Sequence, residues 1–446
     1  MNVLFAGVLA RGPVAEAVGE RAWLQAMLDF EAGLARAQAT VGLIPSADAD
    51  AIAAAADAEA FDAATIGRDA ASGGNPAQPL VKALTAAVTA PSARGHVHSG
   101  ATSQDVVDTA AMLVARTALD LILVDLRGAA DAAAALARAH RDTPIAARTL
   151  LQQAVPTTFG LKAAGWMVAL DEAAARLEAV RATRLAVQLG GAAGTLASLG
   201  ADGPAVVREL ARLLGLAEPL LPWHTDRTRI AEVAGALGEA AGAIAKPARD
   251  VILLSQTEVG EVREGAGGGS STMPHKQNPV ASISALACAR RAPALAGALL
   301  GSMDHEHERA AGAWHAEWAP LMDLLVAVGA AASWLRTCLS DLDVDVERMR
   351  ANLDATGGLV LAERVSTELG RALGRGVAHE AIERAAQRAG EHGRPFGEVL
   401  AEDEAVREHV ASERIDELLD PEGYLGSAGV FVDRALEEHR ARGSAA

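Results

Sequence analysis

The glycine-rich segment 265–279, GAGGGSSTMPHKQNP, gathers residue types that can act on an anion. Four of its first five residues are glycine, which is unfavourable inside helices and strands, so the pattern predicts a mobile loop. The loop would deliver Ser270, Lys276 and Asn278 ahead of a helix N-terminus, where backbone N–H groups favour anions. Lys276 and Asn278 can together bind one carboxylate and orient another, and a serine beside that positive charge could have a lowered pKa. A plain Asn-Pro helix cap is the alternative for Asn278, and the spacing is not that of a phosphate-binding loop.

The segment 95–109, GHVHSGATSQDVVDT, supplies a second cluster of polar side chains. Thr102, Ser103 and Gln104 stand just before a predicted long helix, where they can bind a ligand. Helix capping is the alternative, and Ser103 or Asp105 could provide it alone. His98 lies in the polar part of the segment, and a histidine in such a setting can gain or lose a proton near neutral pH. We therefore treat His98 as a candidate proton carrier, with a structural histidine as the alternative.

The segment 147–160, ARTLLQQAVPTTFG, places polar residues in a mostly apolar connector between long predicted helices. Arg148, Thr149 and Gln152 could each contact an anionic or polar ligand. By itself this segment would carry little information, so its interpretation depends on the other segments.

A histidine-containing stretch at 303–315, MDHEHERAAGAWH, does not match the HExxH zinc motif, because Arg309 stands where the second histidine would be. His305 and His307 are only two residues apart, so on a helix they would not share a face. The stretch therefore predicts a solvated, charged turn instead of a metal site. Arg309 could still reach an anionic ligand.

Runs of apolar residues at helical spacing predict that long helices position these segments. Alanine, the strongest helix former, dominates the composition, whereas the alternating runs typical of strands are nearly absent. The length of several helices favours an all-α fold built around one elongated bundle. The predicted long helices cover about residues 106–140, 158–189, 226–262 with a kink at Pro247, a stretch from 279 onward, and 314–339.

Differences in predicted helix length and in charge along the chain predict a three-segment organisation. Residues 1–110 form an N-terminal helical domain with shorter helices. Residues 111–356 form the central long-helix bundle. Residues 357–446 form a small C-terminal domain of short, strongly charged helices.

The composition argues against several classes of binding partner. The 446 residues carry a formal net charge of −17, which repels nucleic-acid phosphate, so we expect no nucleic-acid partner. Cys288 and Cys338 lack paired spacing and fit buried positions in a reducing cytoplasm. The N-terminus lacks the basic region that begins a signal peptide, and the most apolar stretch, around 321–335, is too short to span a bilayer. We expect a cytoplasmic enzyme without metal, cofactor or membrane partner.

The string GSSTMPHKQNP resembles the GSSxMPxKxNP signature of the fumarase/aspartase superfamily, which is a long and specific motif. HSGATSQDVVDT and RTLLQQAVPTTFG resemble the second and third conserved regions of that superfamily. The regions come in the expected order, so the resemblance covers essentially the whole chain. It implies a homotetramer around a shared helical core, in which three subunits contribute to each active site.

The superfamily's functional residues map onto this chain position by position. By resemblance, Ser270 is the loop serine that moves a proton at the carbon next to a carboxylate. His98 matches a histidine of the adenylosuccinate lyase branch. The remaining matches are ligand-binding positions: Lys276 and Asn278 in the glycine-rich segment, Thr102, Ser103 and Gln104 in the second region, and Thr149 and Gln152 in the third.

One departure from the superfamily pattern reduces the number of activities that the resemblance implies. Fumarase, argininosuccinate lyase and adenylosuccinate lyase carry a histidine after the threonine of the third region, whereas this chain has Leu150. A residue other than histidine there is a feature of the bacterial β-carboxy-cis,cis-muconate cycloisomerases. The strings PWHTDRTR (222–229) and HERAAGAWHAEW (307–318) also resemble that branch.

The resemblance implies closure of a carboxymuconate to a lactone, a step in protocatechuate degradation. The substrate would be a small tricarboxylate, and Arg148 or Arg309 would offset its third charge. One alternative is another superfamily lyase, above all adenylosuccinate lyase, because of His98. A catalytically silent structural relative is the other alternative, and the intact glycine-rich segment argues against it.

Overall fold

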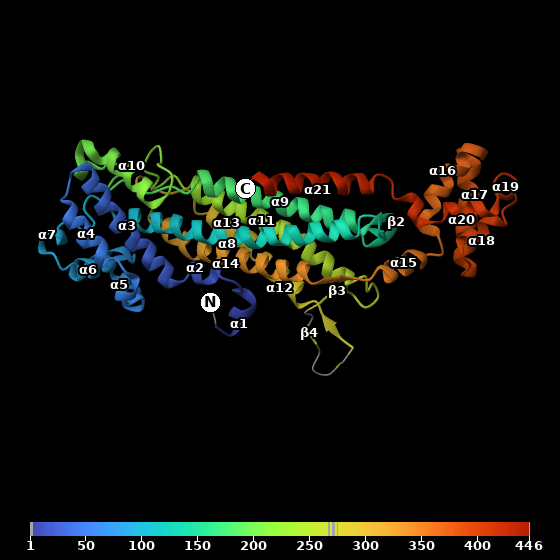
Figure 1. Ribbon diagram of the computed structural model, residues 1–446, viewed down its shortest axis with the longest axis horizontal. Coiled ribbons are helices and arrows are strands. Elements are labelled where there is room, and N and C mark those ends of the chain that lie inside the picture. Colours follow the sequence, from blue (N-terminus) through green and yellow to red (C-terminus); the bar gives the residue numbers. More distant parts are fainter. Residues whose placement is uncertain (1–2, 266–267, 270–272, 274, 446) are drawn as a thin grey trace. The chain divides into compact units, whose positions relative to one another are not determined.

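Helices form most of the chain, as the alanine-rich composition predicts. The computed structural model describes residues 3–265, 268–269, 273 and 275–445. Strands within these residues pair only into small two-stranded sheets, and the all-α prediction is confirmed. Figure 1 shows the elements coloured along the chain.

The chain divides into two compact units, and each boundary falls inside a helix. Unit 1 consists of Met1–Arg127, Glu172–Ala245 and Ser284–Trp334, and unit 2 consists of Gly128–Asp171, Lys246–Ile283 and Leu335–Ala446. The predicted three-domain division at residues 110 and 356 is a different description of the chain and stays a prediction.

The four longest helices each contribute residues to both units. They are α8 (Ser103–Ala139), α9 (Phe159–Thr183), α11 (Thr228–Leu254) and α14 (Ala313–Ser340). The bounds of α8 and α14 lie within three residues of the predicted ones, whereas α9 and α11 end earlier than predicted. Pro247 lies inside α11 without ending it.

Unit 1 also holds the N-terminal helices and two helices from later in the chain. Those that lie wholly within it are α1 (Val3–Leu9), α2 (Val14–Ala17), α3 (Glu20–Val41), α4 (Ser46–Ala55), α5 (Ala63–Gly73), α6 (Ala77–Ala87), α7 (Pro91–Arg94), α10 (Gly203–Leu214) and α13 (Ala292–Leu300). Helix α3 packs against α4 and α10, and its apolar side chains Leu28, Phe30 and Leu34 are fully buried. This packing holds α3 as a stable support for the polar residues described below.

In unit 2, the connector that follows α8 forms an antiparallel hairpin, which the sequence analysis did not predict. Strands β1 (Pro144–Thr149) and β2 (Gln152–Thr158) pair, with Thr149 opposite Gln152. Leu150 and Leu151 form the turn with φ angles of 51° and 65°, as a two-residue hairpin turn of type I′ requires. Both leucines are exposed, Leu150 by 97%.

Short paired strands precede the glycine-rich segment and lie within it, in unit 2. Strand β3 (Val262–Glu264) pairs with β6 (Leu342–Val344), and β4 (Gly268–Gly269) pairs with β5 (Gln277–Asn278). Helix α12 (Val280–Ala289) begins directly after Pro279.

The C-terminal helices of unit 2 are α15 (Val346–Asp354), α16 (Ala362–Leu373), α17 (Arg375–His392), α18 (Phe396–Ala401), α19 (Glu404–Arg407), α20 (Ser412–Leu418) and α21 (Ala428–Ala445). Figure 1 shows α16 to α20 gathered in one cluster, coloured orange to red. Leu369, Phe396 and Leu400 are buried in its small apolar core. Elsewhere in unit 2, Trp166 of α9 donates a hydrogen bond to Asp250 of α11 at 2.8 Å.

Two helical stretches are long and apolar enough to cross a membrane, judged by length and composition alone. They are Val280–Leu300 and Ala313–Ser340, and 44% and 61% of their most apolar 18-residue windows are buried inside the molecule. Core helices of soluble proteins pass the same test, so these stretches are weak support for a membrane span. Helix α14 is, however, longer than the apolar stretch 321–335 on which the sequence argument relied.

Both cysteines are buried, as predicted, and neither forms a disulfide. Burial raises the pKa of the Cys288 thiol to about 11, so the thiol stays neutral at physiological pH.

Candidate active site

The N-terminus of α8 is fixed by Asp105, which is fully buried. Its carboxylate accepts the N–H of Thr102 at 2.9 Å, which completes the cap of the helix. It also accepts the N–H groups of Gly190 and Gly191 at 3.0 and 2.9 Å and lies 2.6 Å from Nε2 of His224. A side chain at position 190 would collide with His224, so glycine is required there. Asp105 therefore holds the start of α8 against two loops, and of the two residues predicted as caps it is Asp105 that bonds the helix end.

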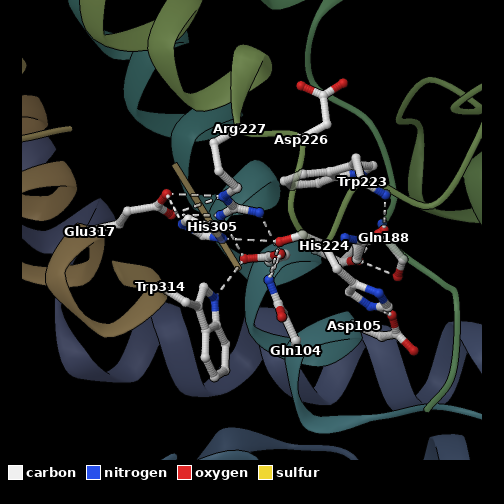
Figure 2. Close-up of polar contacts among 12 residues, drawn as sticks. Gln104, Asp105, Gln188, Trp223, His224, Asp226, Arg227, His305, Trp314 and Glu317 are labelled. Carbon is white, nitrogen blue, oxygen red and sulfur yellow. Dashed lines mark hydrogen bonds and ion pairs between the residues drawn. The ribbon is translucent and has the colours of Figure 1, made fainter. Parts of the chain in front are cut away.

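A buried ionic cluster lies one turn further along α8, in unit 1. Arg227, whose side chain is 1% exposed, donates to Asp108 at 2.8 and 3.1 Å and to Glu317 at 2.6 and 3.0 Å. Trp314 donates its indole N–H to Asp108 at 3.0 Å, and the guanidinium of Arg227 lies 5.0 Å from the ring of Trp223. Figure 2 shows these side chains converging on Arg227. Burial alone would lower the pKa of Arg227, but the two carboxylates raise it, so the guanidinium stays charged.

Gln104 connects this ionic cluster to Arg309. Its side-chain amide donates to Asp108 at 3.0 Å and to the carbonyl of His224 at 2.9 Å, as Figure 2 shows for the residues drawn. Its Oε1 accepts a hydrogen bond from Arg309 at 3.3 Å, although the two residues are 205 positions apart. Arg309 donates its other bonds to the carbonyls of Gly191 and Ala192. Among the residues that the structure describes, Arg309 has no carboxylate partner, so its positive charge is not neutralised by an ion pair.

His98 has a partner that the sequence analysis missed. Its Nδ1 lies 2.7 Å from Oε1 of Glu31, a fully buried carboxylate on α3. His98 has a φ of 59°, an uncommon conformation for a residue other than glycine. Burial alone would lower the pKa of His98, but the hydrogen bond and charge of Glu31, together with the charge of Asp105, raise it. The imidazole is 21% exposed, so it can receive or deliver a proton while Glu31 fixes its orientation.

The expectation that His305 lies in a solvated turn is wrong. Residues 304–312 do form turns instead of a helix, but the His305 side chain is completely buried. Its Nδ1 lies 3.3 Å from the carbonyl of His224, and its Nε2 lies 3.3 Å from Glu317. Both contacts join residues far apart in the sequence, which a charged local sequence cannot reveal. Within the part of the chain that the structure describes, no group of three side chains could hold a metal ion.

In unit 2, Arg148 forms an ion pair with Glu261. Its guanidinium donates to both oxygens of Glu261 at 2.7 and 2.8 Å, and the Glu261 side chain is fully buried. Asn352 donates a further bond to Glu261 at 2.7 Å. Thr149 and Gln152, by contrast, are exposed on either side of the hairpin turn. Of the three candidate residues in this segment, Arg148 holds the hairpin in place and the other two are open to a ligand.

The start of α12 differs from the expected anion site. The N–H groups of Ala281 and Ser282 already donate to Glu264 at 2.9 and 2.8 Å, so these helix-end groups are not free for a substrate. Two of the N–H groups expected to stabilise a substrate carboxylate are therefore already occupied. Lys276 is exposed, and Asn278 is half-buried on β5. Ser270 lies outside the described residues.

The candidate residues fall into two groups. His98, Thr102, Ser103, Gln104 and Arg309 belong to unit 1, where Gln104 and Arg309 are in contact. The group in unit 2 comprises Arg148, Thr149, Gln152, Lys276 and Asn278. Sequence reasoning missed the carboxylates that orient both groups, because a lone glutamate in a helix or short strand has no local signal.

Known proteins resemble this chain along almost its whole length. A model of the family described as "Lyase" matches residues 10–293, and a model described as "Adenylosuccinate lyase C-terminus" matches residues 358–435. A 3-carboxy-cis,cis-muconate cycloisomerase from Bradyrhizobium diazoefficiens is 48% identical over 98% of both chains. A nitrosuccinate lyase from Streptomyces davaonensis is 46% identical over 97% of this chain and 94% of its own.

Among solved structures, the 3-carboxy-cis,cis-muconate lactonizing enzyme from Pseudomonas putida superposes with a TM-score of 0.94. It is 45% identical, and the match covers 99% of each chain. Because the lyase model matches more than half of the chain and these relatives match nearly all of it, the chain belongs to the lyase family of enzymes, in the branch that contains the 3-carboxy-cis,cis-muconate cycloisomerases.

Proposed function

We propose that this enzyme converts 3-carboxy-cis,cis-muconate to 4-carboxymuconolactone (γ-carboxymuconolactone) in protocatechuate degradation through the β-ketoadipate pathway. The observation that carries the proposal is the match to cycloisomerases along the whole chain, in sequence and in structure. We further propose that it acts in the cytoplasm as a homotetramer whose active sites each draw on three subunits.

The reaction is an isomerisation in which every atom of the substrate is kept. An oxygen of one carboxylate adds to a carbon of a conjugated double bond, and a C–O bond closes the five-membered lactone. The displaced π electrons move to the neighbouring carbon and into its own carboxylate, which becomes an aci-carboxylate dianion. A proton then adds to that carbon and restores the ordinary carboxylate.

The residues of unit 2 would serve the developing charge. Lys276 and Asn278 would stabilise the aci-carboxylate, because a cation and an amide donor placed in advance are worth most where charge develops. Ser270 would deliver the proton to carbon as a general acid. Thr149 and Gln152 are exposed and would donate hydrogen bonds to the remaining carboxylates.

The residues of unit 1 would bind the other end of the substrate. Arg309 has no carboxylate partner among the described residues, so we assign to it the third carboxylate of the substrate. Arg148 is occupied by Glu261 and is the weaker choice. His98, held by Glu31, would act as a second proton carrier, while Thr102, Ser103 and Gln104 line the start of α8.

The decisive experiment follows the ultraviolet absorbance of 3-carboxy-cis,cis-muconate, because lactonisation removes one double bond of the conjugated diene. We expect rapid loss of absorbance and a single lactone product, identified by NMR. An enzyme that leaves this absorbance unchanged, while folded and assembled, would contradict the proposal.

A second candidate is cleavage of nitrosuccinate, because the nitrosuccinate lyase is almost as similar to this chain as the cycloisomerase is. That reaction would expel nitrite, a stable anion that leaves without first gaining a proton. Leu150 at the hairpin turn is compatible with it, because neither nitrite nor a carboxylate needs a proton donor in order to leave. The two candidates are separated by measuring nitrite release from nitrosuccinate beside lactonisation, and we expect the kcat/KM for the muconate to be the larger.

A further inference from the structure

Glu264 connects the two ends of the glycine-rich segment. It is the last residue of β3 and precedes Gly265, the first residue of the segment. Its Oε2 accepts the N–H of Ala281 at 2.9 Å, and its Oε1 accepts the N–H of Ser282 at 2.8 Å. Both donors lie in the first turn of α12, just beyond the last residue of the segment. One carboxylate thus links the chain before the segment to the chain after it.

The strand that carries Glu264 is itself held firmly. Strand β3 pairs with β6, and the N–H of Gly265 donates to the carbonyl of Asp341 at 2.8 Å. Between the linked ends, Gly268 pairs with Asn278 and Gly269 with Gln277. Glu264 therefore links the two ends of the chain between which β4 pairs with β5. Lys276 and Asn278 lie between these ends, so their positions depend on the link.

The surroundings of Glu264 exclude a direct role in chemistry. The residue is 6% exposed, and each carboxylate oxygen already accepts a backbone N–H. Its negative charge would repel a substrate carboxylate. The nearby Cys338 thiol stays neutral, because burial and the charge of Glu264 both raise its pKa. Glu264 can therefore influence a reaction only through the residues that it positions.

We propose that Glu264 is a positioning residue that clamps the base of the glycine-rich segment, so that Lys276 and Asn278 keep the geometry that carboxylate binding requires. The role in turnover rests on the proposed function. Linking two points of a chain restricts the conformations open to the residues between them. A displacement of about 1 Å can cost roughly 100-fold in rate, so loss of the Glu264 link should chiefly lower kcat.

The test compares Glu264→Ala and Glu264→Gln with a matched control, Asp345→Ala. Asp345 caps α15 in the same unit by accepting the N–H of Arg348 at 2.8 Å, and its carboxylate has no hydrogen bond to a described residue of the glycine-rich segment. Three quantities are measured for each variant: kcat and KM on the muconate, the rate of trypsin cleavage after Lys276 by mass spectrometry, and the unfolding temperature. Glu264→Gln keeps one acceptor oxygen and the shape of the side chain, so it remains informative if Glu264→Ala fails to fold.

For Glu264→Ala we expect kcat to fall roughly 10- to 100-fold, with a smaller change in KM, and cleavage after Lys276 to accelerate several-fold. Glu264→Gln should lie between Glu264→Ala and the native enzyme in both quantities. Asp345→Ala should lower the unfolding temperature but leave kcat and the cleavage rate unchanged.

Native kcat in both Glu264 variants would overturn the proposal, whether or not cleavage accelerates. Equal losses of kcat in Asp345→Ala would overturn it too, because the effect would then be a general loss of stability. If the native enzyme does not act on the muconate, the proposed function fails, and the cleavage rates alone decide whether Glu264 clamps the segment.

Discussion

At the scale of single residues, the partners of a side chain separate groups that look alike in the sequence. Arg148 and Arg309 are both arginines in segments expected to bind substrate. Arg148 has a buried carboxylate partner, whereas Arg309 donates only to carbonyl and amide oxygens. An arginine with an unneutralised charge is the better ligand for an anion, because no existing ion pair must be broken first.

This difference predicts opposite effects of two substitutions. Arg309→Ala should raise KM for the muconate about tenfold or more and leave stability nearly unchanged, because a charge-assisted hydrogen bond to substrate is lost. Arg148→Ala should destabilise the fold by roughly 3 kcal/mol, because Glu261 would be left buried without its cation. Steady-state kinetics and urea unfolding of both variants measure this, and a reversal of the two effects would contradict the assignment.

The pairing of His98 with Glu31 predicts a pH dependence. The pKa of His98 is raised from its ordinary 6.5, so the pair stabilises the fold fully below about pH 6.5 and loses this contribution as pH rises through the folded-state pKa. Glu31→Gln should therefore lower stability at pH 5.5 more than at pH 8.5, as measured by urea unfolding. It should also move the alkaline limb of the kcat/KM profile to lower pH. An unchanged profile would remove the pair from the proton-transfer steps.

Ser270 and Lys276 should differ in which kinetic constant they affect. Ser270→Ala should lower kcat severely, because it removes the proposed proton donor, while the circular dichroism spectrum stays helical. Lys276→Ala should raise KM as well as lower kcat, because it removes a charge that contacts the bound substrate. Near-native turnover of Ser270→Ala would exclude this serine as the proton donor.

At the scale of elements, the helices could be predicted and the hairpin could not. Apolar residues at helical spacing mark α8 and α14 almost to their ends. The hairpin β1–β2 carries no such mark, because its turn consists of Leu150 and Leu151 instead of the glycine or asparagine that favours positive φ. The pairing of His98 with Glu31, across 67 positions, has no local signal either. Sequence motifs mark the candidate ligand-binding segments, whereas tertiary contacts select the residues that orient them.

The hairpin turn carries a prediction about specificity. Adenylosuccinate and argininosuccinate lyases expel a nitrogen group that leaves poorly unless it is protonated, whereas a lactone opens to a carboxylate, whose conjugate acid has a pKa of roughly 4. An apolar Leu150 is therefore tolerable for lactonisation. Leu150→His should fold normally, because histidine accepts a positive φ more readily than leucine does. We expect it to lower lactonisation without creating either lyase activity.

Steady-state assays of the native enzyme and of Leu150→His on the muconate, adenylosuccinate and argininosuccinate measure this outcome. Native cleavage of adenylosuccinate at a rate that rivals lactonisation would overturn the specificity argument.

At the scale of the whole molecule, the candidate residues are divided between two units of one chain. If each active site draws on three subunits, as we propose, an inactive His98→Ala chain and an inactive Ser270→Ala chain can complement each other. Mixed tetramers would contain some sites in which both residues are intact. Refolding the two variants together should restore partial activity, whereas refolding each one alone should not. Full activity in a monomeric fraction would contradict shared sites.

The distribution of tryptophan gives the enzyme an internal spectroscopic reporter. Five of its six tryptophans lie in unit 1, and Trp314 lies in the ionic cluster that Gln104 joins to Arg309. Trp166, bonded to Asp250, is the single indole of unit 2. In a Trp166→Phe variant, all indole fluorescence would therefore originate in unit 1. An anion that binds at Arg309 should then change the emission without any added dye, and Arg309→Ala should abolish that change.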